Sequence, residues 1–341
     1  MNPQQPSTPS RRTTRRATLG ALSALALSAA APAVLAQARD AAAWPNRPLR
    51  LVVGFPAGSS PDLTARTLAE PLSKALGQPV VVENRVGAGG NIAADLVAKA
   101  TDDHTLGLMI NGNMTIAKLL NPALPYDPLK DLAPVSLIGS APLVLVTDAT
   151  TPGETGRDLM EAARKGGKAW SYGSPGVGTV AHIGMELLKG KAGIDPVHVP
   201  YPGNPQVVTA MMGQQVQLAL LPPGIALPQV RAGKLKVIGV TSSGRSELVP
   251  DFASLDDQGL TRGYRLEVWN AVAAPVSMPR ANLARLSALV AEIVRSPEMR
   301  QKLYAQGWQV AGTTAEGLAT RVQADTADLG AVITARGIKA E

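Results

Sequence analysis

Residues 55–62, Phe-Pro-Ala-Gly-Ser-Ser-Pro-Asp, follow an apolar, β-branched run that predicts a buried strand. Ser59 or Ser60 can cap the helix predicted next. Pro61 and Asp62 both suit the first turn of that helix. A junction of strand, small-residue loop and helix start leaves backbone N–H groups free and partly positive, which is a chemistry that binds anions. An ordinary connecting loop would show the same pattern, so this loop alone does not decide.

Further segments repeat this arrangement of strand, small-residue loop and helix start. Strands are predicted at residues 79–83 and 105–110, before loops at 84–91 and 111–113. The loop at 174–179, Ser-Pro-Gly-Val-Gly-Thr, precedes a helical run and offers the most backbone and hydroxyl donors. Parallel α/β sheets place such loops together at the carboxyl ends of their strands. Several converging loops favour a binding edge more strongly than a single loop does.

Two enzymatic interpretations use residues in or beside these loops. Ser174 and His182 have a spacing that suggests a hydrolase, with Asp62 as an orienting acid, but no Gly-x-Ser-x-Gly elbow occurs. Residues 176–181 fit the dinucleotide-binding pattern Gly-x-Gly-x-x-Ala, but the next predicted strand, 197–201, lacks the acidic residue that binds a ribose. We predict a protein that is not an enzyme and keep a secreted hydrolase as a distant alternative.

Metal and cofactor sites are not indicated. His104, His182 and His198 show no metal-ligand spacing, and the chain contains no cysteine. His104 and His198 fit surface or packing histidines. We predict neither a metal nor a cofactor.

The rest of the chain must supply the sheets that position these loops. A proline-rich connection at 122–134 interrupts the first set of strands and helices, and the βα pattern then restarts, which predicts two α/β lobes. The elements predicted beyond it are strands at 135–138, 143–146, 197–201, 215–221 and 236–241, an extended segment at 264–273, and helices at 157–164, 180–188, 280–295, 297–305 and 315–336.

Residues 1–36 predict a secretory signal peptide that is cleaved near Ala36. Four arginines precede an uncharged, Ala/Leu-rich run at 19–34, and Val34-Leu35-Ala36 fits a cleavage site. The motif at 14–19 resembles a twin-arginine signal, but Thr18 stands where an aromatic residue is usual, so Sec and twin-arginine export both stay open. No cysteine lies near the site, which excludes a lipoprotein anchor.

Removal of that segment changes the charge balance. The chain has 33 basic and 26 acidic residues, and four of the basic residues lie at 1–36, so 29 remain against 26. This near balance and an aromatic content of 3% argue against a nucleic-acid-binding protein. The remaining length can bury the cores of two domains without disulfides.

Short motifs along nearly the whole chain after the signal resemble those of the Bug receptors, the solute-binding proteins of tripartite tricarboxylate transporters. The motifs are Trp44-Pro with Pro48-Leu-Arg, Phe55-Pro-Ala-Gly58 with Asp62 and Arg66, Gly77-Gln-Pro-Val-Val-Val-Glu-Asn84 with Gly87-Ala-Gly-Gly-Asn91, Tyr126-Asp-Pro-Leu-Lys-Asp131, Ser174-Pro-Gly-Val-Gly-Thr179 with His182, His198-Val-Pro-Tyr201 with Gly203, and Ala232-Gly-Lys-Leu235. Each motif is short, but their order and spacing together are highly specific.

The resemblance implies an α/β, two-lobed periplasmic-binding-protein fold of type II, with a ligand cleft between the lobes. We expect one lobe at 37–145 plus 267–341, the other at 146–266, and hinges near 144–147 and 267–271. It also implies a periplasmic receptor that captures a small carboxylate for a transporter. The ligand-binding residues that it implies are Phe55, Ala57, Gly58, Ser59, Ser60, Asp62, Asn111, Asn113, Ser174, Gly178, Thr179, His182, Tyr201 and Gly203.

Some positions depart from the family pattern in ways that bear on the ligand. Ser59 replaces a usual second glycine, and Pro61 replaces a small hydroxyl residue, which removes a backbone donor. Residues 220–224 read Leu-Leu-Pro-Pro-Gly where Asp or Asn is often found. We hypothesise a ligand less polar than an amino acid, namely an aromatic or aliphatic carboxylate. Alternatively, these changes only repack the loops.

The resemblance also bears on partners. Membrane subunits of a transporter are the expected partners of a monomeric receptor, and no nucleic acid is expected. Because the family is often found without a transporter encoded nearby, a ligand sensor that works with a signalling protein is the alternative.

Overall fold

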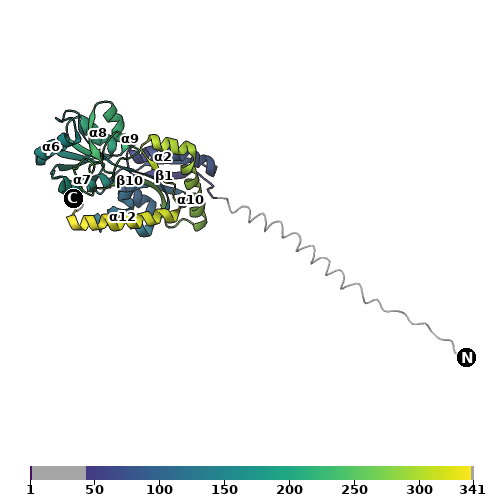
Figure 1. Ribbon diagram of the computed structural model, residues 1–341. Coiled ribbons are helices and arrows are strands. Elements are labelled where there is room, and N and C mark those ends of the chain that lie inside the picture. Colours follow the sequence, from purple (N-terminus) through teal and green to yellow (C-terminus); the bar gives the residue numbers. More distant parts are fainter. Residues whose placement is uncertain (2–43, 339–341) are drawn as a thin grey trace. The chain divides into compact units, whose positions relative to one another are not determined.

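The computed structural model describes Met1 and residues 44–338. The chain divides into two units, Met1–Asn46 and Arg47–Glu341, and every element named below belongs to the second unit. The predicted signal peptide therefore lies outside the described residues, apart from Met1. Within the second unit two separate sheets, each with its own helices, account for the fold (Figure 1).

A six-stranded mixed sheet forms the first lobe, in the order β11-β4-β10-β3-β1-β2. Strands β1, β2 and β3 are parallel, whereas β10 is antiparallel to both of its neighbours. The strands are β1 Leu49–Val53, β2 Val80–Asn84, β3 Thr105–Ile110, β4 Leu132–Pro142, β10 Glu267–Pro275 and β11 Gln309–Val310. The helices are α2 Ser60–Leu76, η1 Ala88–Gly90, α3 Asn91–Ala98, η2 Gly112–Ile116, α4 Ala117–Leu120, α5 Pro128–Asp131, α10 Arg280–Arg295, α11 Pro297–Ala305 and α12 Ala315–Arg336.

A five-stranded mixed sheet forms the second lobe, in the order β7-β6-β8-β5-β9. Here β6 is parallel to β7 and β8, and β5 is antiparallel to β8 and β9. The strands are β5 Val144–Asp148, β6 Ser171–Ser174, β7 Val197–Pro200, β8 Leu218–Leu221 and β9 Leu235–Val240. The helices are α6 Gly156–Gly166, η3 Gly167–Ala169, α7 Val180–Ala192, α8 Asn204–Met212 and α9 Pro223–Arg231.

The chain crosses between the sheets twice, at Leu143 and just before Glu267. Thr241 joins the two crossings. Its hydroxyl donates to Leu266 O at 2.6 Å and accepts from Leu143 N at 2.8 Å, and its own backbone bonds to both segments as well. The two crossing points therefore lie side by side, which is the geometry of a hinge.

Apolar burial holds each sheet to its helices. In α2, the apolar spacing puts Leu68 and Leu72 on one buried face, and each such side chain stabilises the fold by about 1.5–3 kcal/mol. All six residues of β3 are buried because helices or strands cover both faces of the sheet. Trp269 of β10 is also fully buried, and its indole N–H donates to Asp325 of α12 at 2.7 Å. Among the described helices, none has the length and apolar character needed to cross a membrane.

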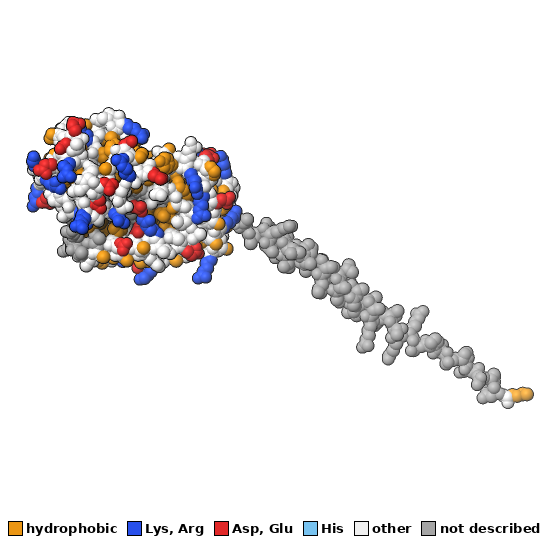
Figure 2. All heavy atoms as spheres, viewed as in Figure 1, with side chains coloured by type: hydrophobic (Ala, Val, Ile, Leu, Met, Phe, Trp, Pro, Cys, Tyr) orange, Lys and Arg blue, Asp and Glu red, His pale blue; other side chains and the backbone are white. Residues whose placement is uncertain are grey.

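Charged side chains of both signs are interspersed over the face shown in Figure 2. Many of the ion pairs are exposed neighbours on one helix, such as Lys74 with Glu70 and Lys302 with Glu298. Each exposed pair of this kind contributes roughly 0.2–1 kcal/mol. The fold therefore depends on its buried layers rather than on surface charge.

The first lobe differs in three places from the elements predicted by the sequence. Strand β4 is one run of 11 residues rather than the short strand predicted at 135–138, because it pairs with β10 along its length. The proline-rich connection contains the short helix α5, which Asp127 caps by accepting from Leu129 N. The predicted loop at 111–113 is instead the start of the π-helical turn η2, where the Thr115 hydroxyl donates to Asn111 O at 2.6 Å.

Candidate functional site

The loops predicted from the sequence meet where the two lobes face each other. Glycines allow the close approach, since a Cβ atom at Gly112 would lie 2.8 Å from Gly178 O. A Cβ at Gly89 would lie 2.5 Å from Val177 O, so the absence of a side chain allows the lobes to approach at this second point as well. Real Cβ atoms do not come this close to a carbonyl oxygen, so the lobes meet here through backbone.

A small cavity of about 30 Å³ lies among these loops. That volume holds roughly two water molecules. Its walls come from both lobes: Phe55, Ser60, Pro61, Ile110, Leu143, Pro175, Thr179, Val180, Ala181, Asn204, Leu220, Pro222, Val268 and Asn270. Within the described part of the chain, no charged side chain lines it.

Several helices begin at this cavity. Ser60 is the first residue of α2, Ala181 lies in the first turn of α7, and Asn204 is the first residue of α8. Their backbone N–H groups have no acceptor among the described residues. Pro222, at the start of α9, lies beside them. Converging helix N-termini make an electropositive site without a charged side chain, which suits a carboxylate.

Asp62 holds the loop at 55–62 in place through hydrogen bonds to its carboxylate. Its carboxylate is buried and accepts from Gly58 N at 3.0 Å, Asn84 Nδ2 at 2.8 Å and Arg66 Nε at 3.0 Å. Asn84 also donates to Phe55 O at 2.8 Å, which ties β2 to the same loop. Burial alone would raise the pKa of Asp62, but these hydrogen bonds together lower it, so the group is ionised at neutral pH.

The loop at 174–179 has its own support. The Ser174 hydroxyl is hydrogen bonded to His198 Nε2 at 2.7 Å, and Gly178 N donates to His182 Nδ1 at 3.2 Å. The two imidazoles stack with centroids 4.2 Å apart. Thr179 caps α7, and its hydroxyl donates to Gly176 O at 2.7 Å. These bonds fix the loop so that the start of α7 faces the cavity.

The two predicted asparagines after β3 lie in different surroundings. Asn113 donates to Gly89 O at 3.1 Å and to Asn91 Oδ1 at 3.0 Å, and so holds the loop after β2. Asn111 donates to Glu267 O at 2.9 Å and lines a different depression, described below. Tyr126 supports Asn113 by donating to its carbonyl oxygen at 3.0 Å, and burial raises the pKa of this phenol.

Phe55, Ser60 and Thr179 are the predicted site residues that line the cavity. Asp62, Asn113, Ser174, Gly178 and His182 surround it and position the loops. Asn111 was placed above. Of the others, Ala57 and Gly58 are exposed, Ser59 is buried and its hydroxyl has no partner among the described residues, Tyr201 packs beside Gly173, and Gly203 packs against Pro56. Whether these residues touch a ligand stays a prediction.

Sequence reasoning passed over two polar residues that line the cavity. Asn204 follows the loop that ends at Gly203, so its position at a helix start could have predicted that it lines the site. Asn270 is the single amide in the otherwise apolar run 268–275 of strand β10, and it pairs with Ile110 at the carboxyl end of β3. A polar residue inside an apolar strand is a signal of a buried site, but only the pairing shows which site.

The residues considered for hydrolysis do not assemble. Ser174 is bonded to His198 rather than His182, and Asp62 is occupied by Arg66 and Asn84. The Ser174 side chain is not among those lining the cavity. No group of three metal-ligating side chains occurs among the residues described.

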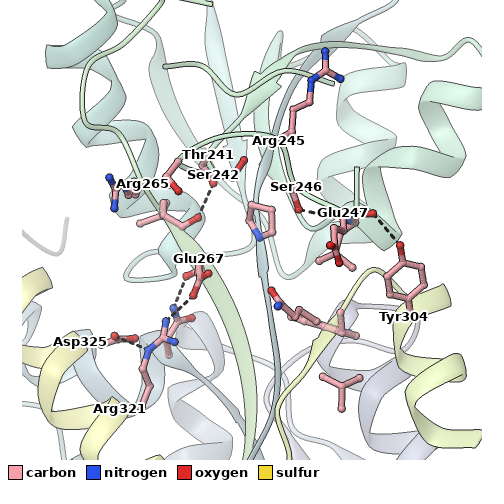
Figure 3. A pocket seen from close by; sticks show the side chains of 18 of the residues that line it. Thr241, Ser242, Arg245, Ser246, Glu247, Arg265, Glu267, Tyr304, Arg321 and Asp325 are labelled. Atoms are coloured by element: carbon pink, nitrogen blue, oxygen red, sulfur yellow. Dashed lines mark hydrogen bonds and ion pairs between the residues drawn. The ribbon is translucent and has the colours of Figure 1, made fainter. Parts of the chain in front are cut away.

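A larger depression of about 1010 Å³ lies beside the hinge (Figure 3). It is open and carries charges of both signs. In Figure 3, Arg321 lies between Glu267 and Asp325, at 3.0 Å and 2.8 Å. The Tyr304 hydroxyl bridges the lobes here by donating to Glu247 O at 2.9 Å. The depression is lined by four arginines and four acidic residues, so it has no net positive charge and is a less suitable carboxylate site than the small cavity.

Comparisons with known proteins agree with this arrangement. Residues 64–338 match the family described as the tripartite tricarboxylate transporter family receptor, TctC. The chain is 32% identical over 306 residues to the UPF0065 protein in the tcbD-tcbE intergenic region of Pseudomonas sp. strain P51, covering 89% of this chain and 90% of that protein. Among solved structures, R. palustris Rpa4515 with adipate has a TM-score of 0.83 and 30% identity, over 87% of this chain and 99% of that one. MatC from Rhodopseudomonas palustris with bound malate has a TM-score of 0.80 and 30% identity, over 85% of this chain and 100% of that one.

Proposed function

Because this chain belongs to the tripartite tricarboxylate transporter receptor family, it is a solute-binding receptor, and we propose that it captures a small carboxylate in the cavity between its lobes. The observation that carries the proposal is the set of helix starts at that cavity. The free N–H groups of Ser60, Ala181 and Asn204 supply donors for one carboxylate. The expected two-lobed fold and the non-enzymatic role are confirmed by the family and by the structural matches.

The energetic requirement supports several donors and closure of the lobes together. Micromolar affinity corresponds to about 8 kcal/mol, whereas one hydrogen bond to a charged group contributes about 1.5–3 kcal/mol. One helix start is therefore not sufficient. Donors from α2 of the first lobe and from α7 and α8 of the second must act at once, which requires the lobes to close on the ligand.

We propose an aliphatic or aromatic carboxylate without an amino group. An ammonium group in the cavity would be buried without a carboxylate beside it, since no acid lines the described walls. Phe55, Leu143, Leu220 and Val268 supply apolar surface for the carbon skeleton. The ligands named for two relatives, adipate and malate, are amine-free carboxylates.

The location and assembly of this receptor follow from the same proposal. We propose export to the periplasm with cleavage near Ala36, lobes at 37–145 plus 267–341 and at 146–266, and a monomer that delivers its ligand to membrane subunits. The crossings at Leu143 and before Glu267 support these boundaries. The family's periplasmic binding proteins support the location.

A thermal-shift screen tests the proposal on purified protein lacking residues 1–36. The panel contains adipate, succinate, malate and benzoate, with glutamate and aspartate as amine-bearing counterparts. A ligand at one hundred times its Kd stabilises the fold by about 2.7 kcal/mol, which raises Tm measurably. We expect a saturable shift with an amine-free carboxylate and a weaker one or none with the amino acids.

Matched variants connect the shift to the site. Asp62→Asn removes the charge that fixes the loop at 55–62 and should weaken binding, whereas Glu70→Gln on the exposed face of the same helix should not. Folded, ligand-free protein that binds no carboxylate, or that binds only amino acids tightly, would contradict the proposal.

A further inference from the structure

A chain of hydrogen bonds fixes the orientation of the Asn270 amide. The Thr64 hydroxyl donates its single proton to Ser60 O at 3.1 Å, inside the first turns of α2. Thr64 Oγ1 must therefore accept in its contact with Asn270, so the amide nitrogen Nδ2, at 2.9 Å, faces Thr64. The amide oxygen Oδ1 consequently points away from Thr64.

That oxygen is a buried acceptor without a partner. Asn270 is 1% exposed, and its Oδ1 has no hydrogen-bond partner among the described residues. The residue lines the cavity beside Ile110 and Val268, which supply no donor from their side chains. Buried polar atoms in folded proteins are nearly always bonded, so this oxygen requires a donor from whatever molecule fills the cavity.

The helix starts and the Asn270 side chain need opposite hydrogen-bonding partners. The N–H groups of Ser60, Ala181 and Asn204 require an acceptor, which a carboxylate supplies. Asn270 Oδ1 requires a donor, which a carboxylate lacks. A hydroxyl on the same ligand provides that donor without adding a charge to the uncharged walls of the cavity.

We propose that Asn270 is a specificity-determining residue whose Oδ1 accepts a hydrogen bond from a hydroxyl of the bound acid, so that the receptor prefers hydroxy acids. This inference rests on the proposed carboxylate function and narrows its ligand class. An acid without the hydroxyl leaves Oδ1 buried and unbonded. We expect the loss of one such bond to weaken binding by about tenfold or more.

Calorimetric titration of the whole receptor with matched pairs of acids tests the assignment. The pairs are malate with succinate, 3-hydroxybutyrate with butyrate, and mandelate with phenylacetate. For the pair that the cavity admits, we expect the hydroxy acid to bind about tenfold more tightly. Asn270→Ala should bring the ratio near one, chiefly by weakening the hydroxy acid.

Variants at Thr64 keep the test independent of a folding defect at Asn270. Thr64→Ser retains the hydroxyl that orients the amide and should keep the preference. Thr64→Val removes the acceptor for Nδ2, lets the amide rotate, and should reduce the preference.

The outcomes separate the two proposals. Binding of carboxylates with equal affinity within each pair, or a preference that survives Asn270→Ala, overturns the role of Asn270 and leaves the carboxylate function in place. Absence of binding to any acid of either kind overturns the proposed function and this inference with it.

Discussion

His198 shows how one residue couples the packing of the second lobe to pH. Its ring stacks between Tyr172 and His182, with centroids 4.8 Å and 4.2 Å away, and its Nε2 is bonded to the Ser174 hydroxyl. Burial, together with the nearby His182 and Lys189, lowers the pKa of His198 to about 3. Glu186 lies on α7 with His182 and Lys189, and its carboxylate accepts a hydrogen bond from the Tyr172 hydroxyl at 2.6 Å. The neutral imidazole is therefore the form that this environment stabilises.

At the residue scale, we predict that stability falls as the pH drops below about 6.5. The pKa of an unfolded histidine is about 6.5 and that of folded His198 about 3, so the unfolded chain takes up the proton first. The stabilisation is fully present above pH 6.5 and is lost as the pH falls toward 3. Allowing for solvent screening of a partly exposed ring, we expect a loss of about 1 kcal/mol between pH 7.5 and 5.

Urea unfolding at the two pH values measures this loss. His198→Gln keeps a hydrogen-bonding group for Ser174 but has no proton to gain, so its stability should change less over the same interval. An equal loss in the two proteins would assign the pH dependence to other groups.

At the scale of elements, the two lobes meet through glycines at helix and loop starts. Gly112 opens η2 and faces Gly178 O of the other lobe. On α9, a Cβ atom at Gly224 would lie 2.1 Å from Gln306 O. Because backbone meets backbone at these points, even one methyl group interferes with closure.

We predict that Gly112→Ala weakens ligand binding about tenfold or more without lowering the stability of the ligand-free fold. Gly112 has no positive φ, so alanine adds no backbone strain there, and in a helical turn it is intrinsically favoured over glycine by roughly 0.5–1 kcal/mol. The added methyl group would lie 2.8 Å from Gly178 O in the arrangement of lobes that forms the cavity, so it should reduce the population of the form that binds.

Calorimetric titration together with urea unfolding separates the two effects. Gly213→Ala is the matched control, because the nearest atoms to its Cβ are at 3.4 Å and belong to its own lobe. Unchanged affinity in Gly112→Ala would show that the contact with Gly178 is not needed for binding.

Local patterns predicted those elements whose boundaries are set by neighbouring residues. The strand, glycine loop and helix start around residues 50–62 and 171–188 are recognisable because caps, prolines and glycines act within a few residues. The length of β4 was not recognisable, because pairing with β10, more than a hundred residues away, sets it. The turn η2 was missed for a different reason: the local pattern was misleading, because Asn and Gly after a strand usually indicate a loop.

At the scale of the whole molecule, the candidate site is where long-range pairing brings separate segments together. The loop after β1 could be placed near the site from the sequence because helix starts follow parallel strands. Asn270 could not, because its position depends on the antiparallel pairing of β10 with β3 and on Thr64 in α2. The donors near helix starts can thus be predicted from local sequence. The position of Asn270, the acceptor that we propose distinguishes one ligand from another, depends instead on long-range pairing in the fold.

The small volume of the cavity has a consequence for the whole molecule. Space of about 30 Å³ admits roughly two water molecules, which is less than an acid with several carbons needs. A ligand must therefore enter while the lobes are further apart, and the lobes must then close on it through the crossings that Thr241 joins. The receptor in solution should accordingly exchange between a wider form and a closed one.

We predict that ligand shifts the distance between Leu63 and Thr209 from a long, broad distribution to a single shorter one. Both residues are exposed, and they lie on α2 and α8, the helices of opposite lobes that begin at the cavity. Because the chain has no cysteine, Leu63→Cys and Thr209→Cys give two unique sites for spin labels. Distances measured with and without a saturating carboxylate report closure directly, and adding Gly112→Ala should keep part of the population at the longer distance. An identical distribution with and without ligand would mean that binding does not require lobe movement, and closure would then not explain the affinity.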